Sequence, residues 1–328
     1  MKAIRYASYG EPEQLNLVEA APPQPSELEV LVRVVAASAN PLDWRLLGGA
    51  PWLMRRLFHL QKPTPEEPAS AGADLAGVIT AVGSQVTRFQ PGDEVFGTCK
   101  GSFAEFACAE EKNLALKPAE ISFEQAAALP IAAVTALQGL RDHGKLQPTE
   151  KVLINGAAGG VGHCAVQIAK AMGAEVTAVC STRNVEFVRT LGADVVIDYT
   201  RQDFARLGQR WNLFLDCHAS HSLTACRRVL LPGGRYIAVG GPVDTGPLAF
   251  GRMFTVLLIA ALFTRFDNRR LALFIAKIKP EDLTFLAGMM QAGKLRMEIE
   301  QTCSLPETAA ALRHLKDGHV RGKLIVAP

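Results

Sequence analysis

Short apolar runs separated by turn residues dominate the first third of the chain. Between turns such as Pro91-Gly92-Asp93, the runs are rich in valine and alanine and cover 30–36, 76–82, 94–96 and 104–108. Runs of this length between Pro and Gly are typical of β-strands. The opening Met1-Lys2-Ala3-Ile4-Arg5 enters a strand-like segment without an apolar signal region. Residues 1–123 are therefore predicted to be mostly β.

The pattern changes near Ser122. Ser122 followed three residues later by Gln125 is a helix-start signal. Beyond it, apolar runs alternate with segments of helical spacing, at 152–154, 175–180, 194–197, 212–215 and 235–240, with 271–277 as a candidate sixth strand. This alternation predicts a doubly wound parallel sheet.

The C-terminal part returns to the first pattern. Helices are predicted over 281–292 and 306–316, and residues 322–326 read as a strand that completes the N-terminal β region. The fold class is thus α/β, with a doubly wound domain inserted into a discontinuous β domain. The predicted ranges are 124–278 for the insertion and 1–123 with 279–328 for the β domain.

One junction between strand and helix carries chemistry. Residues 152–162 read Val-Leu-Ile-Asn-Gly-Ala-Ala-Gly-Gly-Val-Gly, and residues 163–172 continue at helical spacing. Gly159 is expected to permit the tight turn, Gly160 or Gly162 to let strand and helix approach closely, and the helix N-terminus to face a pyrophosphate. A glycine turn made purely for packing is the alternative. The predicted cofactor-binding residues here are Ala158, Gly159, Gly160, Val161 and Gly162.

The next strand, 175–180, ends in Ser181-Thr182-Arg183-Asn184. NAD enzymes place an acidic residue at this point to hold the ribose hydroxyls. No acid is present here, and a nearby guanidinium accommodates a 2′-phosphate. Ser181 and Arg183 therefore favour NADP(H), with a solvated surface charge as the alternative for Arg183.

Composition narrows the class of protein. The 328 residues are 48% hydrophobic and 20% charged, which suffices for two domains with their own cores. The net charge is only +3, so no nucleic-acid partner is expected. Seven widely spaced cysteines without a CxxC pair favour reduced, buried thiols in a cytoplasmic protein.

Two segments have competing interpretations. The apolar run 254–263 is shorter than the about 20 residues that a bilayer requires. It is read as a core helix or a pocket lid, and membrane contact by a surface helix is the alternative. Cys217-His218-Ala219-Ser220-His221 looks like a metal cluster at first, but its spacing specifies no metal geometry, so no metal is predicted there.

Several blocks together resemble the medium-chain dehydrogenase/reductase superfamily over essentially the whole length. They cover 37–44, 72–77, 91–97, 129–137, the glycine turn and 321–323. Within the superfamily the chain is similar to the zinc-independent quinone oxidoreductase branch. The resemblance implies a Rossmann doubly wound parallel sheet inserted into a discontinuous GroES-like β-barrel domain.

Departures from the zinc-dependent relatives bear on the chemistry. Those relatives carry Cys where this chain has Asn40, His where it has Ala73, and a third Cys near 129–131, where no thiol occurs here. Catalytic zinc needs three N, S or O ligands, so no metal is predicted. Without a Lewis acid, an electron-poor acceptor is easier to reduce. The resemblance therefore implies hydride transfer from NADPH to a quinone or to an alkene conjugated to a carbonyl.

The resemblance also implies site residues. Asn40, Asp43 and Arg45 are expected to line the substrate site, with Arg45 stabilising the substrate oxyanion. A structural turn at Asn40 and a surface ion pair of Arg45 with a carboxylate are the alternatives. The other expected cofactor contacts, each with a structural alternative such as a solvated lysine, are Thr135, Tyr199, Gly240, Gly241 and Lys323.

The sequence also leads to expectations about the oligomeric state and the substrate. The strand 271–277 is apolar on both faces and makes a poor solvent edge, so it is expected to pair with its own copy in a homodimer. The expected partner is a small-molecule quinone or conjugated carbonyl. An NAD(P)-dependent alcohol dehydrogenase and a non-catalytic NADPH-binding regulatory protein remain the alternatives. The sequence names neither the physiological substrate nor a proton donor.

Overall fold

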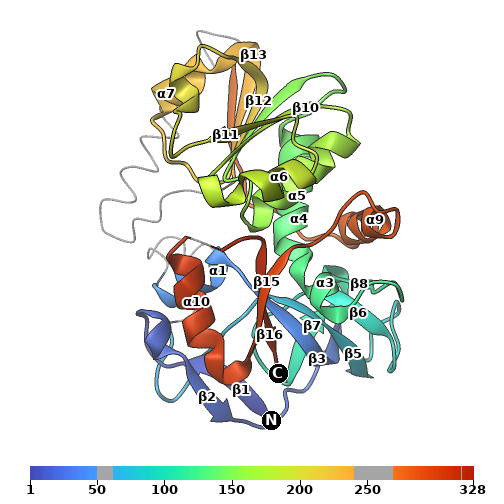
Figure 1. Cartoon of the computed structure of the whole chain (residues 1–328). Helices are drawn as coiled ribbons and strands as arrows, with labels where there is room; N and C mark the ends of the chain where they lie inside the picture. The colour runs from blue at the N-terminus through green and yellow to red at the C-terminus, as the bar shows by residue number, and fades with distance from the viewer. Residues whose placement is uncertain (50–61, 240–268, 319) are drawn as a thin grey trace. The chain divides into compact units, whose positions relative to one another are not determined.

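The computed structural model describes residues 1–49, 62–239, 269–318 and 320–328. The chain forms two compact units (Figure 1). The first comprises Met1–Val134, Lys277–Gly293 and Met297–Pro328, and the second comprises Thr135–Ala276 and Lys294–Arg296. Both ends of the chain therefore belong to the first unit, and the second unit is an insertion in its sequence.

The first unit is built on two sheets. A seven-stranded sheet has the order β15-β16-β3-β5-β6-β8 with β7 paired to β3, and a three-stranded sheet has the order β2-β1-β4. All pairings of the larger sheet except β15–β16 are antiparallel. The strands are β1 (Lys2–Tyr6), β2 (Asn16–Glu19), β3 (Glu29–Ala39), β4 (Ala69–Ser70), β5 (Asp74–Val82), β6 (Glu94–Thr98), β7 (Phe106–Glu110), β8 (Leu114–Leu116), β15 (Ile299–Ser304) and β16 (Lys323–Ala327).

The central strand of the larger sheet, β3, contains the first valine-rich run. Val30 and Val32 are fully buried and alternate with more exposed neighbours, because successive side chains of a strand point to opposite faces. They share one apolar core with Leu75 of β5 and Leu324 of β16. This core holds the end of β3 in place, and the next helix, α1 (Pro41–Leu47), begins directly after it.

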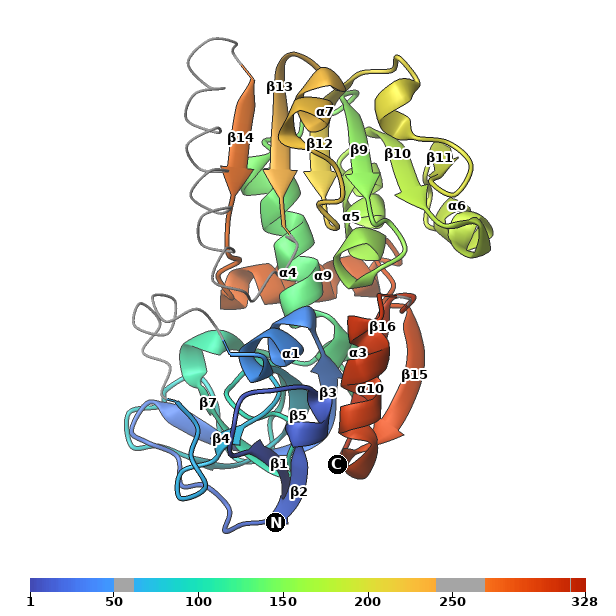
Figure 2. The same ribbon diagram turned by 90° about the vertical axis from the view of Figure 1, so that its left-hand side faces the viewer.

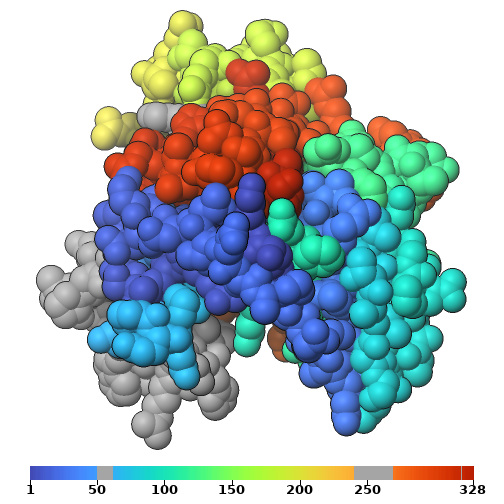
Figure 3. Space-filling model, turned by 90° about the horizontal axis from the view of Figure 1, so that it is seen from below, coloured from blue at the N-terminus to red at the C-terminus, as the bar shows by residue number. Residues whose placement is uncertain are grey.

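The closing strand lies where the sequence predicts it. β16 pairs antiparallel with β3, with Leu324 opposite Ala39 and Val326 opposite Ala37. Residues from both ends of the chain consequently lie side by side on one face, in blue and red (Figure 3). The predicted helices over 281–292 and 306–316 correspond to α9 (Pro280–Gln291) and α10 (Thr308–Lys316), the latter preceded by a 3-10 turn.

Helix α3 (Phe123–Ala128) bears on where the first unit ends. Its capping box is present as predicted, because Gln125 N donates to Ser122 Oγ and Ser122 N donates to Gln125 Oε1, both at 3.3 Å. The helix packs against β3 and β5. The first unit therefore continues to Val134, inside α4 (Pro130–Gln138), and the structure places the boundary at 134/135 rather than at 123/124.

The second unit is a six-stranded parallel sheet with the order β11-β10-β9-β12-β13-β14 (Figure 2). The five predicted runs overlap β9 to β13, which confirms the doubly wound sheet, although β13 begins at Leu230, before its predicted run 235–240. The strands are β9 (Lys151–Asn155), β10 (Glu175–Cys180), β11 (Val195–Asp198), β12 (Trp211–Asp216), β13 (Leu230–Ala238) and β14 (Arg270–Leu273). The other helices are α5 (Gly160–Ala171), α6 (Val185–Thr190) and α7 (Leu223–Arg228).

The strand order marks the place for a ligand. From β9 the chain adds β10 and β11 on one side, and then crosses to add β12 on the other side. In open α/β sheets, ligands bind outside the carboxyl ends of the strands where the order reverses. The turn after β9 lies at this point, and it is the predicted glycine turn.

Strand β14 is shorter than the predicted 271–277. It covers Arg270–Leu273, pairs with β13 and forms an edge of the described sheet. Leu273 and Ile275 are 45% and 67% exposed. The apolar segment 254–263 lies outside the described residues, and in the part of the chain that the structure describes no helix is long and apolar enough to cross a membrane.

Candidate active site

Two glycines shape the turn between β9 and α5. Gly156 has a φ of +78°, in the left-handed region that favours glycine. A Cβ on Gly162 would lie 2.1 Å from the Gly156 carbonyl oxygen and 2.7 Å from Ala157 Cα. The expected roles are thus partly reassigned. The tight bend is at Gly156, because Gly159 has an ordinary φ of −80°, and the close approach is at Gly162.

The N-terminal turn of α5 is stabilised by His163, which the sequence did not predict as a site residue. His163 is fully buried, and both its backbone N and its ring Nδ1 donate to Gly159 O at 2.9 Å. Its Nε2 lies 3.6 Å from Cys164 Sγ. The helix starts at Gly160, so its first backbone N–H groups and its positive dipole end are suited to a pyrophosphate.

The end of β10 carries the predicted 2′-phosphate residues. Ser181 precedes a 3-10 turn over Thr182–Asn184, and its Oγ accepts a 3.3 Å hydrogen bond from Asn184 Nδ2. Arg183 on this turn is exposed. Tyr199, after β11, is 59% exposed, so its ring is not a buried packing aromatic.

A carboxylate also lies at this edge, although none follows β10 in the sequence. Asp198, the last residue of β11, accepts a 2.6 Å hydrogen bond from Thr182 Oγ1 and a 2.8 Å bond from Thr200 Oγ1. These hydroxyls, with Arg201 Nε at 3.4 Å, lower the pKa of Asp198. Asp198 thereby links, through hydrogen bonds, the loop that carries Arg183 to the loop that carries Tyr199.

The remaining cofactor predictions differ in outcome. Thr135 is 9% exposed on α4. Gly240 and Gly241 lie outside the described residues. Lys323 is 3% exposed, so the alternative of a solvated surface lysine is wrong. Its Nζ contacts Ala39 O, Asn40 Oδ1 and Asp74 Oδ2 in the N-terminal region.

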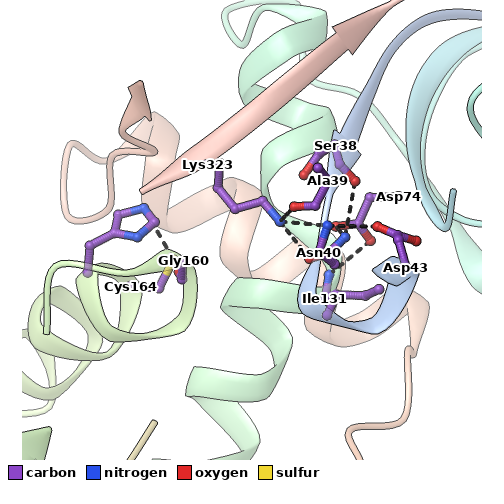
Figure 4. A network of polar contacts seen from close by, with 10 residues as sticks. Ser38, Ala39, Asn40, Asp43, Asp74, Ile131, Gly160, Cys164 and Lys323 are labelled. Atoms are coloured by element: carbon purple, nitrogen blue, oxygen red, sulfur yellow. Dashed lines mark hydrogen bonds and ion pairs between the residues drawn. The ribbon is translucent and has the colours of Figure 1, made fainter. Parts of the chain in front are cut away.

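A buried polar cluster lies where β3 ends, where β5 and β16 begin, and where α1 starts (Figure 4). Lys323 Nζ donates to Asn40 Oδ1 at 2.6 Å and to Ala39 O at 3.1 Å, and it lies 3.6 Å from Asp74 Oδ2. Asn40 Nδ2 donates to Asp74 Oδ2 at 2.9 Å and to Ser38 O at 3.1 Å.

Asn40 and Asp43, both expected to line the substrate site, make hydrogen bonds inside this cluster. Both Nδ2 donors of Asn40 are engaged inside the protein, so Asn40 cannot donate to a substrate oxygen without breaking a buried bond. Asp43 accepts the 2.7 Å hydrogen bond from Asn40 N that fixes the start of α1. Asp74 was not singled out as a site residue, although it lies in the quoted block 72–77. Its signal was a carboxylate within an otherwise apolar run.

Burial controls the electrostatics of the cluster. It raises the pKa of Asp43 to about 7, helped by the charge of Asp74, whereas the hydrogen bond from Asn40 N opposes the rise. It raises the pKa of Asp74 to about 6, against the opposing effects of Lys323, Asn40 and Ile131 N. Both carboxyls are thus less acidic than free aspartate.

Arg45 is half-buried on α1. Its guanidinium carbon lies 5.4 Å from the centroid of the Trp44 ring, a distance at which a cation is attracted to the ring face. Lys316 of α10 lies 5.9 Å from the same centroid. Burial lowers the pKa of Arg45, but the guanidinium stays charged. It therefore remains a candidate donor to a substrate oxygen.

The histidines after β12 do not form a metal cluster. His221 Nε2 lies 3.1 Å from Asp203 Oδ1, and His218 is exposed. Within the described ranges, no three His, Cys, Asp or Glu side chains gather to hold a metal ion. All seven cysteines are free thiols. Asp216, the last residue of β12, accepts hydrogen bonds from Asn155 Nδ2 and from the Tyr236 hydroxyl.

Comparison with known families gives two matches. Residues 26–119 match the family described as "Alcohol dehydrogenase GroES-like domain", and residues 191–326 match the family described as "Zinc-binding dehydrogenase". The first match confirms the GroES-like nature of the N-terminal β region.

Whole-length relatives agree with these matches. The chain is 35% identical over 344 residues to "Chloroplast envelope quinone oxidoreductase homolog" of Arabidopsis thaliana, covering 100% of this chain and 98% of the relative. It is 32% identical over 343 residues to "NADPH-dependent alkenal/one oxidoreductase, chloroplastic" of the same plant, covering 100% and 80%. The solved quinone oxidoreductase of Coxiella burnetii has a TM-score of 0.87 and 32% identity, covering 100% of this chain and 99% of that one. With its inserted parallel sheet, glycine turn and GroES-like region, the chain belongs to the medium-chain dehydrogenase/reductase superfamily, in its quinone oxidoreductase branch.

Proposed function

We propose that the chain is an NADPH-dependent oxidoreductase that reduces quinones or α,β-unsaturated carbonyl compounds. The observation that carries this proposal is the turn built by Gly156 and Gly162 at the switch point of the parallel sheet. It occurs in a chain that resembles a named NADPH-dependent alkenal/one oxidoreductase over its whole length. The relatives named quinone oxidoreductase support the other substrate class.

The second unit fits the cofactor. The space that a Cβ of Gly162 would fill is occupied by the backbone of Gly156 and Ala157, so the turn lies directly against the helix N-terminus. Residues 158–162 would hold the pyrophosphate there. Ser181, Arg183 and Tyr199 would hold the 2′-phosphate, because a hydroxyl and an exposed guanidinium suit a dianion. Thr135 and, from the undescribed part, Gly240 and Gly241 complete the proposed contacts. When bound, NADPH supplies a hydride.

The polar cluster of the first unit does not fit zinc. Asn40 and Ala73 offer neither a thiolate nor an imidazole. The Lys323 ammonium lies 2.6 Å from Asn40 Oδ1 and would repel a divalent cation placed there. We therefore propose zinc-independent chemistry in which Arg45 stabilises the oxyanion of the reduced substrate. Lys323 contributes to this cluster, and its contact with the cofactor stays a prediction.

Transient kinetics with a substrate panel test the proposed function. We expect rapid loss of nicotinamide absorbance when the NADPH-loaded protein meets a quinone or a 2-alkenal. NADPH binding without turnover of any acceptor would instead support the regulatory alternative. Reduction of NADP⁺ driven by a simple alcohol would support the dehydrogenase alternative.

The proposed assembly is a homodimer through the edge strand β14. The support is an apolar edge with Leu273 45% and Ile275 67% exposed, since such edges are normally paired or covered. Phe274 lies one residue beyond β14 and stacks on His143 with ring centroids 4.1 Å apart. A cytoplasmic location stays a prediction that rests on the free cysteines.

A further inference from the structure

Among the residues that the structure describes, the buried cluster holds two carboxyl groups and one cation, Lys323. Asp43 and Asp74 are 6% and 0% exposed, and Lys323 is 3% exposed. Asp74 lies 3.6 Å from Lys323 Nζ, which balances one negative charge. A second carboxylate without a balancing charge in the same buried place loses favourable solvation, so the cluster favours keeping one proton.

Hydrogen bonding indicates which of the two carboxyl groups keeps the proton. Asp74 receives donors on both oxygens: Ile131 N at 3.2 Å on Oδ1, and Asn40 Nδ2 at 2.9 Å on Oδ2. Within the described residues, Asp43 receives one hydrogen-bond donor, Asn40 N. Since donors and a nearby ammonium favour a carboxylate, Asp74 is the ionised member and Asp43 the protonated one. Burial raises the pKa of both carboxyls, which favours a retained proton in the cluster.

Other titratable groups around Asp43 do not compete for this proton. The pKa of Tyr6 on β1 and that of Cys99 after β6 are both raised, chiefly by burial, so both stay neutral near pH 7. From the neighbouring α10, the cations are already paired with acids of the 3-10 turn over Pro12–Gln14 and the residue before it. These ion pairs are Lys316 with Glu11 and Arg313 with Glu13.

We propose that Asp43 is the proton donor of the reaction, and that Asp74 and Lys323 are positioning residues that keep the exchangeable proton on Asp43. This inference rests on the proposed function. Hydride addition leaves a negative charge on the substrate oxygen, as an enolate or a hydroquinone monoanion. The O–H bond of the Asp43 carboxyl then breaks, its proton joins the substrate oxygen, and Asp43 becomes a carboxylate. Water returns the proton before the next turnover, so atoms and charge balance.

Infrared spectroscopy tests the location of the proton without turnover. We expect the wild-type protein to show the C=O stretch of a protonated carboxyl that disappears as pH rises through about 7. Asp43→Asn should remove this band. Asp74→Asn should move its disappearance to lower pH, because a neighbouring negative charge is gone. Asp93→Asn is the matched control, since Asp93 accepts a hydrogen bond from Gln90 N across the same spacing, 2.9 Å long, at a surface turn. A band that still disappears near pH 7 in Asp43→Asn overturns the assignment.

Kinetics test the donation. We expect the wild-type kcat for a 2-alkenal to fall as pH rises through about 7, and Asp43→Asn to lower kcat by about 100-fold, with a flat profile and an unchanged Kd for NADPH. A wild-type kcat and profile in Asp43→Asn overturn the donation. If that variant does not fold, Asp74→Asn decides, because a profile that does not move to lower pH overturns the proposal. Absence of any turnover by the wild type overturns the proposed function, while the infrared titration still locates the proton.

Discussion

Gly162→Ala is the sharpest test of the cofactor turn. The added Cβ would lie 2.1 Å from Gly156 O and 2.7 Å from Ala157 Cα, well inside van der Waals contact. Both neighbours are backbone atoms, so neither can rotate away, and the turn must move relative to α5 by about 1 Å. Overpacking of this kind costs about 1–3 kcal/mol of stability. A displacement of about 1 Å at the helix N-terminus should weaken NADPH binding by at least about 10-fold.

Gly288→Ala provides the matched control. Gly288 is also a helical glycine, on α9, but a Cβ there would meet nothing within 4 Å. Removing a glycine from a helix interior should stabilise the protein by about 0.5–1 kcal/mol. Its NADPH affinity should equal that of the wild type.

Nicotinamide fluorescence titration and thermal unfolding measure both variants. We expect a weaker Kd and a lower Tm for Gly162→Ala, and a normal Kd with an equal or higher Tm for Gly288→Ala. Wild-type affinity in Gly162→Ala would refute the assignment of the turn as the pyrophosphate site. A lower Tm with normal affinity would show that the glycine serves packing alone.

Four further predictions follow from other parts of the structure. Arg183→Ala should weaken NADPH by about 10- to 150-fold and NADH far less, because one charge-assisted phosphate contact is lost; equal effects on both cofactors in binding titrations would place the phosphate elsewhere. The free energy of unfolding should fall by up to about 4 kcal/mol as pH rises from 4 to 8, because Asp43 ionises near pH 3.8 in the unfolded chain and only near pH 7 in the folded one. Denaturant titrations across this range should find a flatter profile in Asp43→Asn. Leu273→Glu with Ile275→Glu should convert a dimer to a monomer in sedimentation velocity, whereas Leu116→Glu, at a 58% exposed position elsewhere, should not; a wild type that sediments as a monomer contradicts the proposed assembly. Purified protein should contain far less than one zinc per chain, and chelator should change neither Tm nor turnover; zinc that resists dialysis would contradict zinc-independent chemistry.

The sequence determined the strands of the second unit and the place of its ligand turn. Five apolar runs predicted β9 to β13, because a strand buried on both faces of a parallel sheet must be apolar throughout. Gly156 and Gly162 both stood in the quoted turn. Which glycine bends the chain and which allows close approach was a matter of φ and contact distance, and here the expected role of Gly159 belonged to Gly156. Local patterns also predicted the capping box at Ser122.

Only the tertiary structure decided the polar cluster. Lys323 donates to Asn40 from 283 positions away, and Asn40 donates to Asp74 across 34 positions. No periodicity spans such separations, and a lone Lys near a chain end reads as solvated. The pairing of β16 with β3 places the Lys323 ammonium at the end of β3. The pairing of Ser38 with Asp74 places the Asp74 carboxylate at the same point. The ionisation of Asp43 was equally beyond the sequence, because a carboxyl's pKa depends on the water, charges and donors around it, and only the folded sheet sets these.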